Sequence, residues 1–373
     1  MRLKLSILIA KLAALLSQKV LRRSGETISG RVLLALYPKA ITELSKGKKI
    51  ICVSGTNGKT STTKALVSII SKLGSVATSP SGSNLERGVA AALMNKSEFA
   101  VLEVDELHLS RVIEEAKPKA VLLLNLTRDQ LHRMHEVKRV ADRWAQSAAS
   151  APETLFIGDI DDPFVALALN SAAQSEKISF GGRKHQDGAV CPSCGKYLKW
   201  VRNNYKCACG LSNSNPDQSF ESGSAAYRNA TMANVVAKFF GAKAVAIDEK
   251  SLERSVDQVH KGVKANIRLT KNPASWSEAL QSVTGQNALL IVNAREVDGI
   301  DTSWLWDISF SALSGKRVVV CGERAFDIAY RLHVEGIEAE ITTNFAEAIA
   351  KFEPGADVHV LAAYTAFHDL VNS

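Results

Sequence analysis

A turn of the phosphate-binding type is the clearest chemical signal in the sequence. It directly follows the apolar residues 50–53 and consists of Gly55, Thr56, Asn57, Gly58, Lys59, Thr60 and Ser61. Glycines let the backbone curl so that several N–H groups point inward, while Lys59 can reach the β- and γ-phosphates and the Thr60 hydroxyl can bind Mg²⁺. A glycine-rich turn that only caps a helix does not explain the lysine and the hydroxyl residues behind it. We therefore expect a nucleoside triphosphate site, in a variant that has Val53 where the general motif begins with glycine.

Four of the six cysteines form a second signal, a CxxC pair and a CxC pair separated by twelve residues. Four thiolates at such spacing can surround one Zn²⁺ tetrahedrally, and a site closed by four sulfurs is structural. Disulfides are the alternative, and they are disfavoured because Cys52 and Cys321 lie in strand-like runs and no signal peptide is recognisable. We predict a zinc ribbon whose ligands are Cys191, Cys194, Cys207 and Cys209.

Strands and helices alternate around the phosphate-binding turn, which is typical of a parallel sheet with ligands at the carboxyl ends of its strands. We predict strands over residues 49–54, 99–104 and 120–126, and helices over residues 60–73 and 107–116. Polar residues follow three of the predicted strands: Glu103, Asp105 and Glu106; Asn125, Arg128, Asp129 and Gln130; Asp159, Asp161 and Asp162.

Acidic side chains at strand ends can hold Mg²⁺ opposite the turn, or they can be solvated turn residues. We interpret Glu103 and Asp129 as functional, with Thr60 and Glu103 as the magnesium ligands. Asp159 and Glu106 fit solvated turn residues better. Arg128 can bind a phosphate or a carboxylate with two of its nitrogens.

Length and composition allow two domains, since 373 residues with 46% apolar content suffice for ordinary cores. We predict an N-terminal helical segment over residues 1–46 and an ATP-binding α/β domain over 47–245, with the ribbon inserted at about 185–215. A second α/β domain is expected over 250–373, and the charged segment 248–262, helical in pattern, is expected to carry the hinge.

The net charge of +8 is scattered, with much of the excess before residue 50, which favours an anionic substrate or a membrane surface over nucleic acid. Residues 1–21 predict an amphipathic helix packed on the protein, and transient membrane contact is the alternative. No transmembrane helix is predicted, so we expect a cytoplasmic protein. If residues 1–21 contact the membrane, we expect the protein to be peripheral at its inner face.

Residues 53–60 resemble the ATP loop of the Mur ligases and folylpolyglutamate synthases, which form amide bonds through an acyl phosphate. Further strings resemble the MurT branch of the Mur ligase family, over about residues 30–370. These are residues 81–88 (SGSNLERG), 103–106 (EVDE), 125–131 (NLTRDQL), the four-cysteine ribbon, 271–274 (KNPA), 298–307 (DGIDTSWLWD) and 364–366 (YTA).

The resemblance implies a Mur ligase central domain and a C-terminal Mur-like α/β domain that contacts a partner. It implies ATP-dependent amidation of the D-glutamate α-carboxylate in the lipid II peptide stem, which gives D-isoglutamine for peptidoglycan synthesis. Ammonia would come from a GatD-type glutaminase in a heterodimer, and an aspartate of this chain would complete the catalytic triad of that partner. Asp301 is the matching residue, with Asp298 and Asp307 as alternatives, and Asn229 matches an ATP contact.

The chain departs from the family patterns at two places. Ala226 stands where an asparagine near the nucleotide is usual, and Gln130–His132 replaces a His-Leu-Asp run. Trp304 and Trp306 are either interface anchors or core residues. Two other functions remain open: a stand-alone amide ligase like folylpolyglutamate synthase, and an ATP-regulated zinc-ribbon protein that binds nucleic acid.

Overall fold

The computed structural model describes residues 2–21, 26–79, 83–128, 137–246, 248–252, 255–295 and 298–372. The chain forms two compact units. Unit 1 comprises Met1–Leu126 and Val137–Leu252, and unit 2 comprises Glu253–Ser373 with the short segment that includes Thr127 and Arg128. Within the described ranges, no helix is long and apolar enough to span a bilayer.

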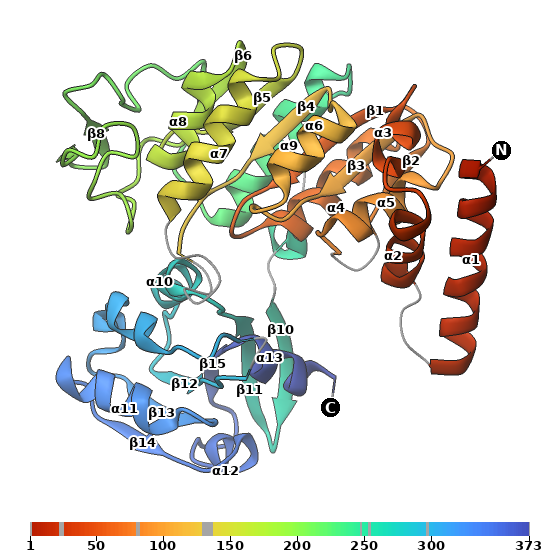
Figure 1. The fold of residues 1–373 in the computed structure, drawn as a ribbon. Coiled ribbons are helices and arrows are strands. Elements are labelled where there is room, and N and C mark those ends of the chain that lie inside the picture. Colours follow the sequence, from red (N-terminus) through yellow and green to blue (C-terminus); the bar gives the residue numbers. More distant parts are fainter. Residues whose placement is uncertain are drawn as a thin grey trace. The chain divides into compact units, whose positions relative to one another are not determined.

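Unit 1 is built on a seven-stranded parallel sheet of order β2-β3-β1-β4-β5-β6-β9 (Figure 1). Its central strands, β1, β3, β4 and β5, are mostly apolar and buried on both faces, as expected for a sheet covered by helices on each side. The strands are β1 (Lys49–Ser54), β2 (Val76–Thr78), β3 (Phe99–Glu103), β4 (Ala120–Leu123), β5 (Leu155–Asp159), β6 (Gln174–Ser179) and β9 (Gln218–Ser219).

Helices cover this sheet on both faces. On one face α4 packs against α9, and their side chains share a core with β1, β3 and β4. A second group of helices consists of α5, α6, α7 and α8. In this group α6 packs against α7, and α7 packs against α8. The helices are α1 (Arg2–Leu21), α2 (Glu26–Leu36), α3 (Ala40–Ser45), α4 (Lys59–Ile70), α5 (Glu86–Leu93), α6 (Leu109–Ala116), α7 (Val137–Ala149), α8 (Pro163–Ser171), α9 (Ala225–Phe239) and η2 (Glu249–Leu252).

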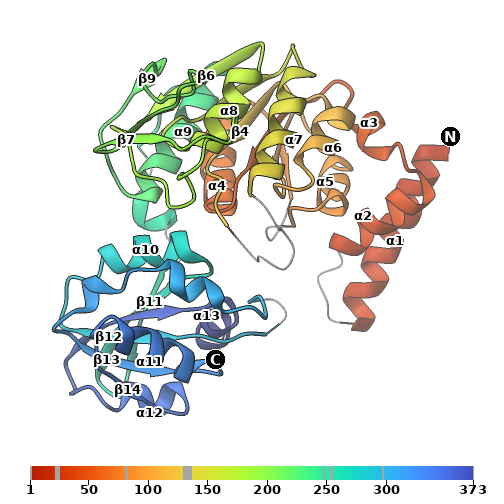
Figure 2. The ribbon, with the colours of Figure 1, turned by 60° about the vertical axis from the view of Figure 1, so that its left-hand side comes forward.

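The four-cysteine insertion lies between β6 and β9 and carries its own hairpin of β7 (Lys199–Val201) and β8 (Asn204–Lys206), paired antiparallel. The Tyr205 hydroxyl donates to the Ile160 carbonyl at 2.9 Å, which ties the hairpin to the end of β5. At the other end of unit 1, α1 lies alongside α2, as both views show (Figures 1 and 2).

Unit 2 is a six-stranded sheet of order β10-β11-β15-β12-β13-β14, parallel except for the β10–β11 pair. Its strands are β10 (Ser255–His260), β11 (Val263–Leu269), β12 (Asn287–Ile291), β13 (Arg317–Cys321), β14 (Ala339–Ile341) and β15 (Asp357–Ala362). Its helices are α10 (Pro273–Gln281), η3 (Ser303–Asp307), η4 (Ser311–Leu313), α11 (Ala325–Val334), α12 (Phe345–Ile349) and α13 (Tyr364–Val371).

The prediction of a helical segment over residues 248–262 was wrong for most of its length. Among the described residues of this segment, only Glu249–Leu252 is helical, as a short 3₁₀ turn, and β10 occupies Ser255–His260. The polar residues Asp257, Gln258 and His260 belong to this strand at the edge of the sheet, where exposed and half-buried residues alternate from Val256 on.

Candidate functional site

The turn between β1 and α4 has the backbone that the sequence requires. Gly55 has a φ of 141° and Gly58 a φ of 86°, a region that other residues rarely adopt. Gly58 is the residue before the first turn of α4, which begins at Lys59 and contains Thr60 and Ser61. Asn125, at the end of β4, fixes the turn, because its Oδ1 accepts from the Asn57 N–H at 3.0 Å and the carbonyl of Asn125 accepts from the Thr56 N–H at 2.9 Å.

Lys59 is held inside the turn by acceptors on three sides. Its ammonium donates to the Gly55 carbonyl and, at 3.3 Å, to the Thr56 carbonyl. It also forms an ion pair of 2.9 Å with Glu106, and the two side chains are only 10% and 6% exposed. The Trp144 indole N–H donates to the Glu106 carbonyl at 3.0 Å and fixes the segment that carries this carboxylate.

The interpretation of Glu106 as a solvated turn residue was therefore wrong. It is buried and it positions the lysine that the sequence singles out for phosphate binding. The only signal in the sequence was its place just after a strand that ends beside the turn. The contact with Trp144, which lies on a helix 38 residues further along the chain, could not be predicted from this position after a strand.

The other predicted nucleotide and magnesium residues lie around the same turn. Glu103 is buried at the end of β3, in register with Val53 of β1. Asn229, on α9, is also buried, and its amide lies so close to Gly58 that a Cβ there would collide with it. The oxygens of Thr60 and Glu103 are of the kind that Mg²⁺ prefers. Asp129 and Gln130 lie outside the described residues.

The three aspartates after β5 are buried, so the interpretation of Asp159 as a solvated residue was also wrong. Burial raises the pKa of Asp159 to about 7, against the favourable charges of Arg183 and Arg228. Asp161 accepts four hydrogen bonds, from the Ser179 hydroxyl, the backbone N–H groups of Phe180 and Gly182, and the Asn213 amide, at 2.8–3.1 Å. Asp161 thus joins the cysteine insertion to the sheet.

Asp162 has a structural role as well. Its Oδ1 accepts from the Phe164 N–H at 2.8 Å and caps α8, and its Oδ2 accepts from the Leu126 N–H at 2.7 Å. His185 Nε2 lies 3.2 Å from the same Oδ2, in a pair that is almost fully buried. Burial alone would raise the pKa of Asp162, but His185 and the backbone donors hold it below its usual value.

The four predicted zinc ligands converge. The Sγ atoms of Cys191, Cys194, Cys207 and Cys209 all lie within 4.8 Å of one another, and none of these cysteines is in a disulfide. The nearest pairs are 3.4 and 3.6 Å apart, far longer than a disulfide bond. Gly195 and Gly210, both with positive φ, allow the tight turns that bring each pair together. The Leu211 N–H lowers the pKa of Cys209 to about 6, which favours its thiolate, whereas burial raises the pKa of Cys191 to about 12.

The candidate aspartates of unit 2 have different surroundings. Asp298 is 8% exposed and accepts from the Thr365 N–H at 2.7 Å, the Thr365 hydroxyl at 2.6 Å and the Arg295 N–H at 3.1 Å. Asp307 pairs with Arg128, also of unit 2, at 2.9 Å. Asp301 is exposed, and its Oδ1 accepts from the Ser303 N–H at 2.8 Å.

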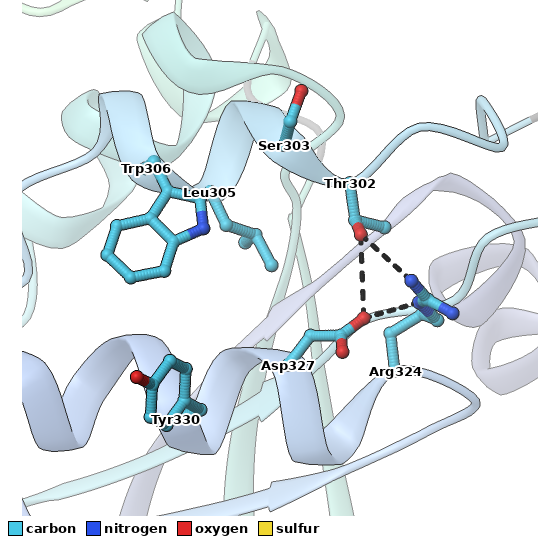
Figure 3. Close-up of a pocket in the computed structure, with 7 residues that line it drawn as sticks. All are labelled: Thr302, Ser303, Leu305, Trp306, Arg324, Asp327 and Tyr330. Atoms are coloured by element: carbon cyan, nitrogen blue, oxygen red, sulfur yellow. Dashed lines mark hydrogen bonds and ion pairs between the residues drawn. The ribbon is translucent and has the colours of Figure 1, made fainter.

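Exposed apolar side chains gather beside Asp301. Trp306 on η3 is 55% exposed and lies 6.2 Å from the Tyr330 ring, whereas Trp304 packs into the core. Figure 3 shows Trp306 and Tyr330 on the facing elements η3 and α11, at a pocket also lined by Thr302, Arg324 and Asp327. We define the aromatic surface as these exposed residues: Ile300, Trp306, Phe326, Tyr330 and Val334.

Two family descriptions match the chain. Residues 53–208 match the Mur ligase middle domain, and residues 269–367 match the MurT ligase C-terminal domain. The chain belongs to the MurT branch of the Mur ligase family. Mur ligases use ATP and Mg²⁺, and this chain is accordingly an ATP-dependent ligase.

Curated MurT proteins are similar to the chain over nearly its whole length. The subunit MurT of the glutamine-hydrolysing lipid II isoglutaminyl synthase of Streptococcus pneumoniae (strain ATCC BAA-255 / R6) is 27% identical, over 94% of this chain and 93% of that protein. The MurT of Staphylococcus aureus (strain N315) is 26% identical, over 91% and 90%. Both are named as subunits, which implies a partner subunit.

The fold is that of the solved Mur-type ligases. A pseudomurein peptide ligase type C from Methanothermus fervidus has a TM-score of 0.65 with 17% identity, over 87% of this chain and 78% of that one. The expected Mur ligase α/β fold with a parallel sheet is thus confirmed, and the four-cysteine cluster is present within it.

Proposed function

We propose that this MurT-type ligase amidates the α-carboxylate of D-glutamate in the peptide stem of lipid II, with ATP as the energy source and ammonia from a GatD-type glutaminase. The observation that carries the proposal is the match to both MurT relatives across more than nine tenths of the chain, together with a complete lysine-containing phosphate turn. The proposed product is the D-isoglutamine stem used in peptidoglycan synthesis.

The chemistry has two steps. A carboxylate oxygen of the substrate attacks the γ-phosphorus of ATP, the bond to the β,γ-bridging oxygen breaks, and ADP leaves. Ammonia then attacks the acyl carbon of the acyl phosphate, the carbon–oxygen bond to phosphate breaks, and phosphate and a proton are released to leave a carboxamide. Catalysis of such a transfer depends mainly on positioning and on offsetting negative charge.

The residues of this chain have distinct roles in that scheme. Lys59 places its ammonium in the turn, where it offsets charge on the transferring phosphoryl group, and Glu106 holds it there. The backbone N–H groups of Gly55, Gly58 and the first turn of α4, including Ser61, bind phosphate oxygens, and Asn229 contacts the nucleotide. Thr56 and Asn57 shape the turn, because their N–H groups donate to Asn125. Mg²⁺, held by Thr60 and Glu103, would neutralise further phosphate charge.

The aromatic surface of unit 2 is proposed as the docking site of the glutaminase. Phe326, Tyr330 and Val334 follow one another at intervals of four residues, so they lie on one face of α11. Exposed aromatic side chains of this kind are enriched where proteins associate, and tryptophan and tyrosine often dominate the binding energy. Trp306 completes the surface beside Asp301.

Asp301 is the proposed third member of the glutaminase triad. A carboxylate that orients a histidine of another protein must be exposed before the two proteins bind. Asp298 does not meet this requirement, because it is buried and holds the first turn of α13 through Thr365. Asp301 and Asp307 are both exposed, and Asp307 pairs with Arg128. Asp301 is preferred because it opens the Asp-x-Ser-Trp-x-Trp-Asp string that resembles the family pattern.

The Asp301→Asn variant tests this assignment in the purified heterodimer. It should lose most glutamine-dependent amidation, about four orders of magnitude if it acts like the aspartate of other triads, and keep amidation from free ammonia. Asp357→Asn, which changes an exposed aspartate elsewhere in unit 2, should leave both routes unchanged. Equal loss of both routes in Asp301→Asn would reject the triad role.

Zinc is the proposed metal of the four-cysteine site. Four thiolates around a tetrahedral Zn²⁺ lie a little under 4 Å apart, given a Zn–S distance of about 2.3 Å, and the sulfur separations here agree with that. A tetrahedral site closed by four thiolates leaves no coordination position for water or substrate, so its proposed role is to hold the insertion together.

A further inference from the structure

The N-terminal helix α1 has two apolar faces, and only one of them is covered by protein. Ala10 is buried and the buried hydroxyls Ser6 and Ser17 lie on the same face, where α1 packs on α2. The opposite face carries Leu5, Leu8, Ile9, Leu12, Leu15 and Leu16, which are 41–64% exposed. A helix that is apolar all round normally has both faces buried.

The helix pair is fixed in a way that keeps this leucine face outward. α2 packs against both α1 and α5, and Gly30 on α2 meets the Arg87 carbonyl so closely that a Cβ there would collide with it. This close approach requires glycine at position 30 and fixes α2 against α5. Since α1 packs on α2 with its small residues, rotating its leucines inward would force large side chains into that contact.

Charge on α1 indicates what covers the leucine face. The helix Arg2–Leu21 contains no acidic residue. At about 100° per residue, the exposed leucines and Ile9 span an arc of about 120°, with Lys4 and Lys11 at one edge and Arg2 at the other. Arg2, Lys4 and Lys11 are each exposed. Leucines flanked by cations are the pattern of helices that lie in the interface of an anionic bilayer.

We propose that α1 binds the surface of an anionic membrane through its leucine face, with Arg2, Lys4 and Lys11 at the level of the lipid headgroups. The helix is about 30 Å long and would lie in the plane of the bilayer. Membrane binding itself does not depend on the ligase activity. The role of this membrane binding, which is to bring the enzyme to a lipid-linked substrate, rests on the proposed function.

Vesicle sedimentation tests the proposal with the full chain, using vesicles of phosphatidylcholine with phosphatidylglycerol in equal parts, or of phosphatidylcholine alone. The wild type should bind the anionic vesicles and bind them less as salt is raised. The variant Leu8→Gln/Leu12→Gln/Leu15→Gln should bind at least tenfold more weakly than the wild type. Lys4→Gln and Lys11→Gln should each weaken binding about fivefold, and these two single substitutions should act on the anionic vesicles only. Val201→Gln/Val259→Gln, which changes two exposed apolar residues elsewhere, should bind like the wild type.

Several outcomes would overturn the proposal. These are a wild type that does not bind anionic vesicles, a triple leucine variant that still binds, and a leucine face that instead drives self-association in sedimentation velocity. Glutamine supports helix well, so circular dichroism should be unchanged in the triple variant. The vesicles contain no lipid II, and amidation of a detergent-dissolved substrate by the same variant should match the wild type. A failure of membrane binding is thereby distinguished from a failure of the proposed function.

Discussion

Removing the ammonium of Lys59 should destabilise unit 1 as well as abolish activity. The Lys59–Glu106 pair is 2.9 Å long, with side chains 10% and 6% exposed. At an effective dielectric constant of about 20 its attraction is about 6 kcal/mol before desolvation is subtracted. Removing one partner of such a buried pair costs about 3–5 kcal/mol, because the other charge is left buried without compensation. We expect a loss in this range for Lys59→Met.

The second substitution in the pair should restore part of that stability. In Lys59→Met/Glu106→Gln the buried group is a neutral amide, whose desolvation costs less than that of a carboxylate. We expect the double variant to recover about 2 kcal/mol over Lys59→Met while remaining inactive. Lys64→Met, an exposed lysine on the same helix, should change stability by less than about 0.5 kcal/mol.

The assay is hydrogen exchange of the α4 amides as a function of urea, which reports on unit 1 alone and does not assume that the two units unfold together. A Lys59→Met variant within about 1 kcal/mol of the wild type would refute the view that Glu106 depends on Lys59 for its charge compensation. A double variant less stable than the single one would refute it as well.

Two further predictions concern buried titratable groups of unit 1. Burial raises the pKa of Asp159 to about 7 from 3.8, so its contribution to stability is present below pH 4 and lost as the pH rises through 7. Asp159→Asn should therefore gain up to about 4 kcal/mol over the wild type between pH 4 and pH 9 in urea titrations, and a difference that does not vary with pH would contradict this. The purified protein should contain one Zn²⁺ per chain by elemental mass spectrometry, and Cys191→Ser should lose it together with exchange protection in residues 191–213, while β1 and β4 stay protected. A wild type without zinc, or a variant in which β1 also loses protection, would count against a local structural role.

Local features of the chain could be predicted from the sequence. The strand Lys49–Ser54 has the predicted bounds, because it is an apolar run between polar residues. The phosphate turn and the cysteine pairs also depend on residues close together in the chain. The glycines, the lysine and the thiols carry their own geometric requirements.

Features that depend on distant segments could not be predicted. Glu106 and Asp159 lie at or just after the ends of strands, where solvated acids are common, yet both are buried. The ion pair of Glu106 with Lys59 and its hydrogen bond with Trp144 join residues 38 and more positions apart in the chain. Trp304 and Trp306 are two residues apart in the same string, yet one packs in the core and the other is exposed. Their difference depends on how η3 lies against α10 and α11.

The packing of α1 on α2 fits the packed-helix interpretation of residues 1–21 for one face of the helix, and the membrane alternative stays a proposal for the opposite face. Ser6, Ala10 and Ser17 pack inward, while Leu8, Leu12 and others face outward. The sequence alone could not separate the faces, because both are apolar. The position of α2 decides which residues are covered.

Incorporation of heavy nitrogen tests the central claim most directly. The purified chain, without a partner, is incubated with lipid II in detergent, ATP, Mg²⁺ and ammonium enriched in the heavy isotope of nitrogen. The account predicts one heavy nitrogen in the stem peptide at the D-glutamate α-carboxyl, one ADP formed per product, and neither in Lys59→Ala. Recovery of unmodified lipid II after ATP has been consumed, or amidation that persists in Lys59→Ala, would contradict it.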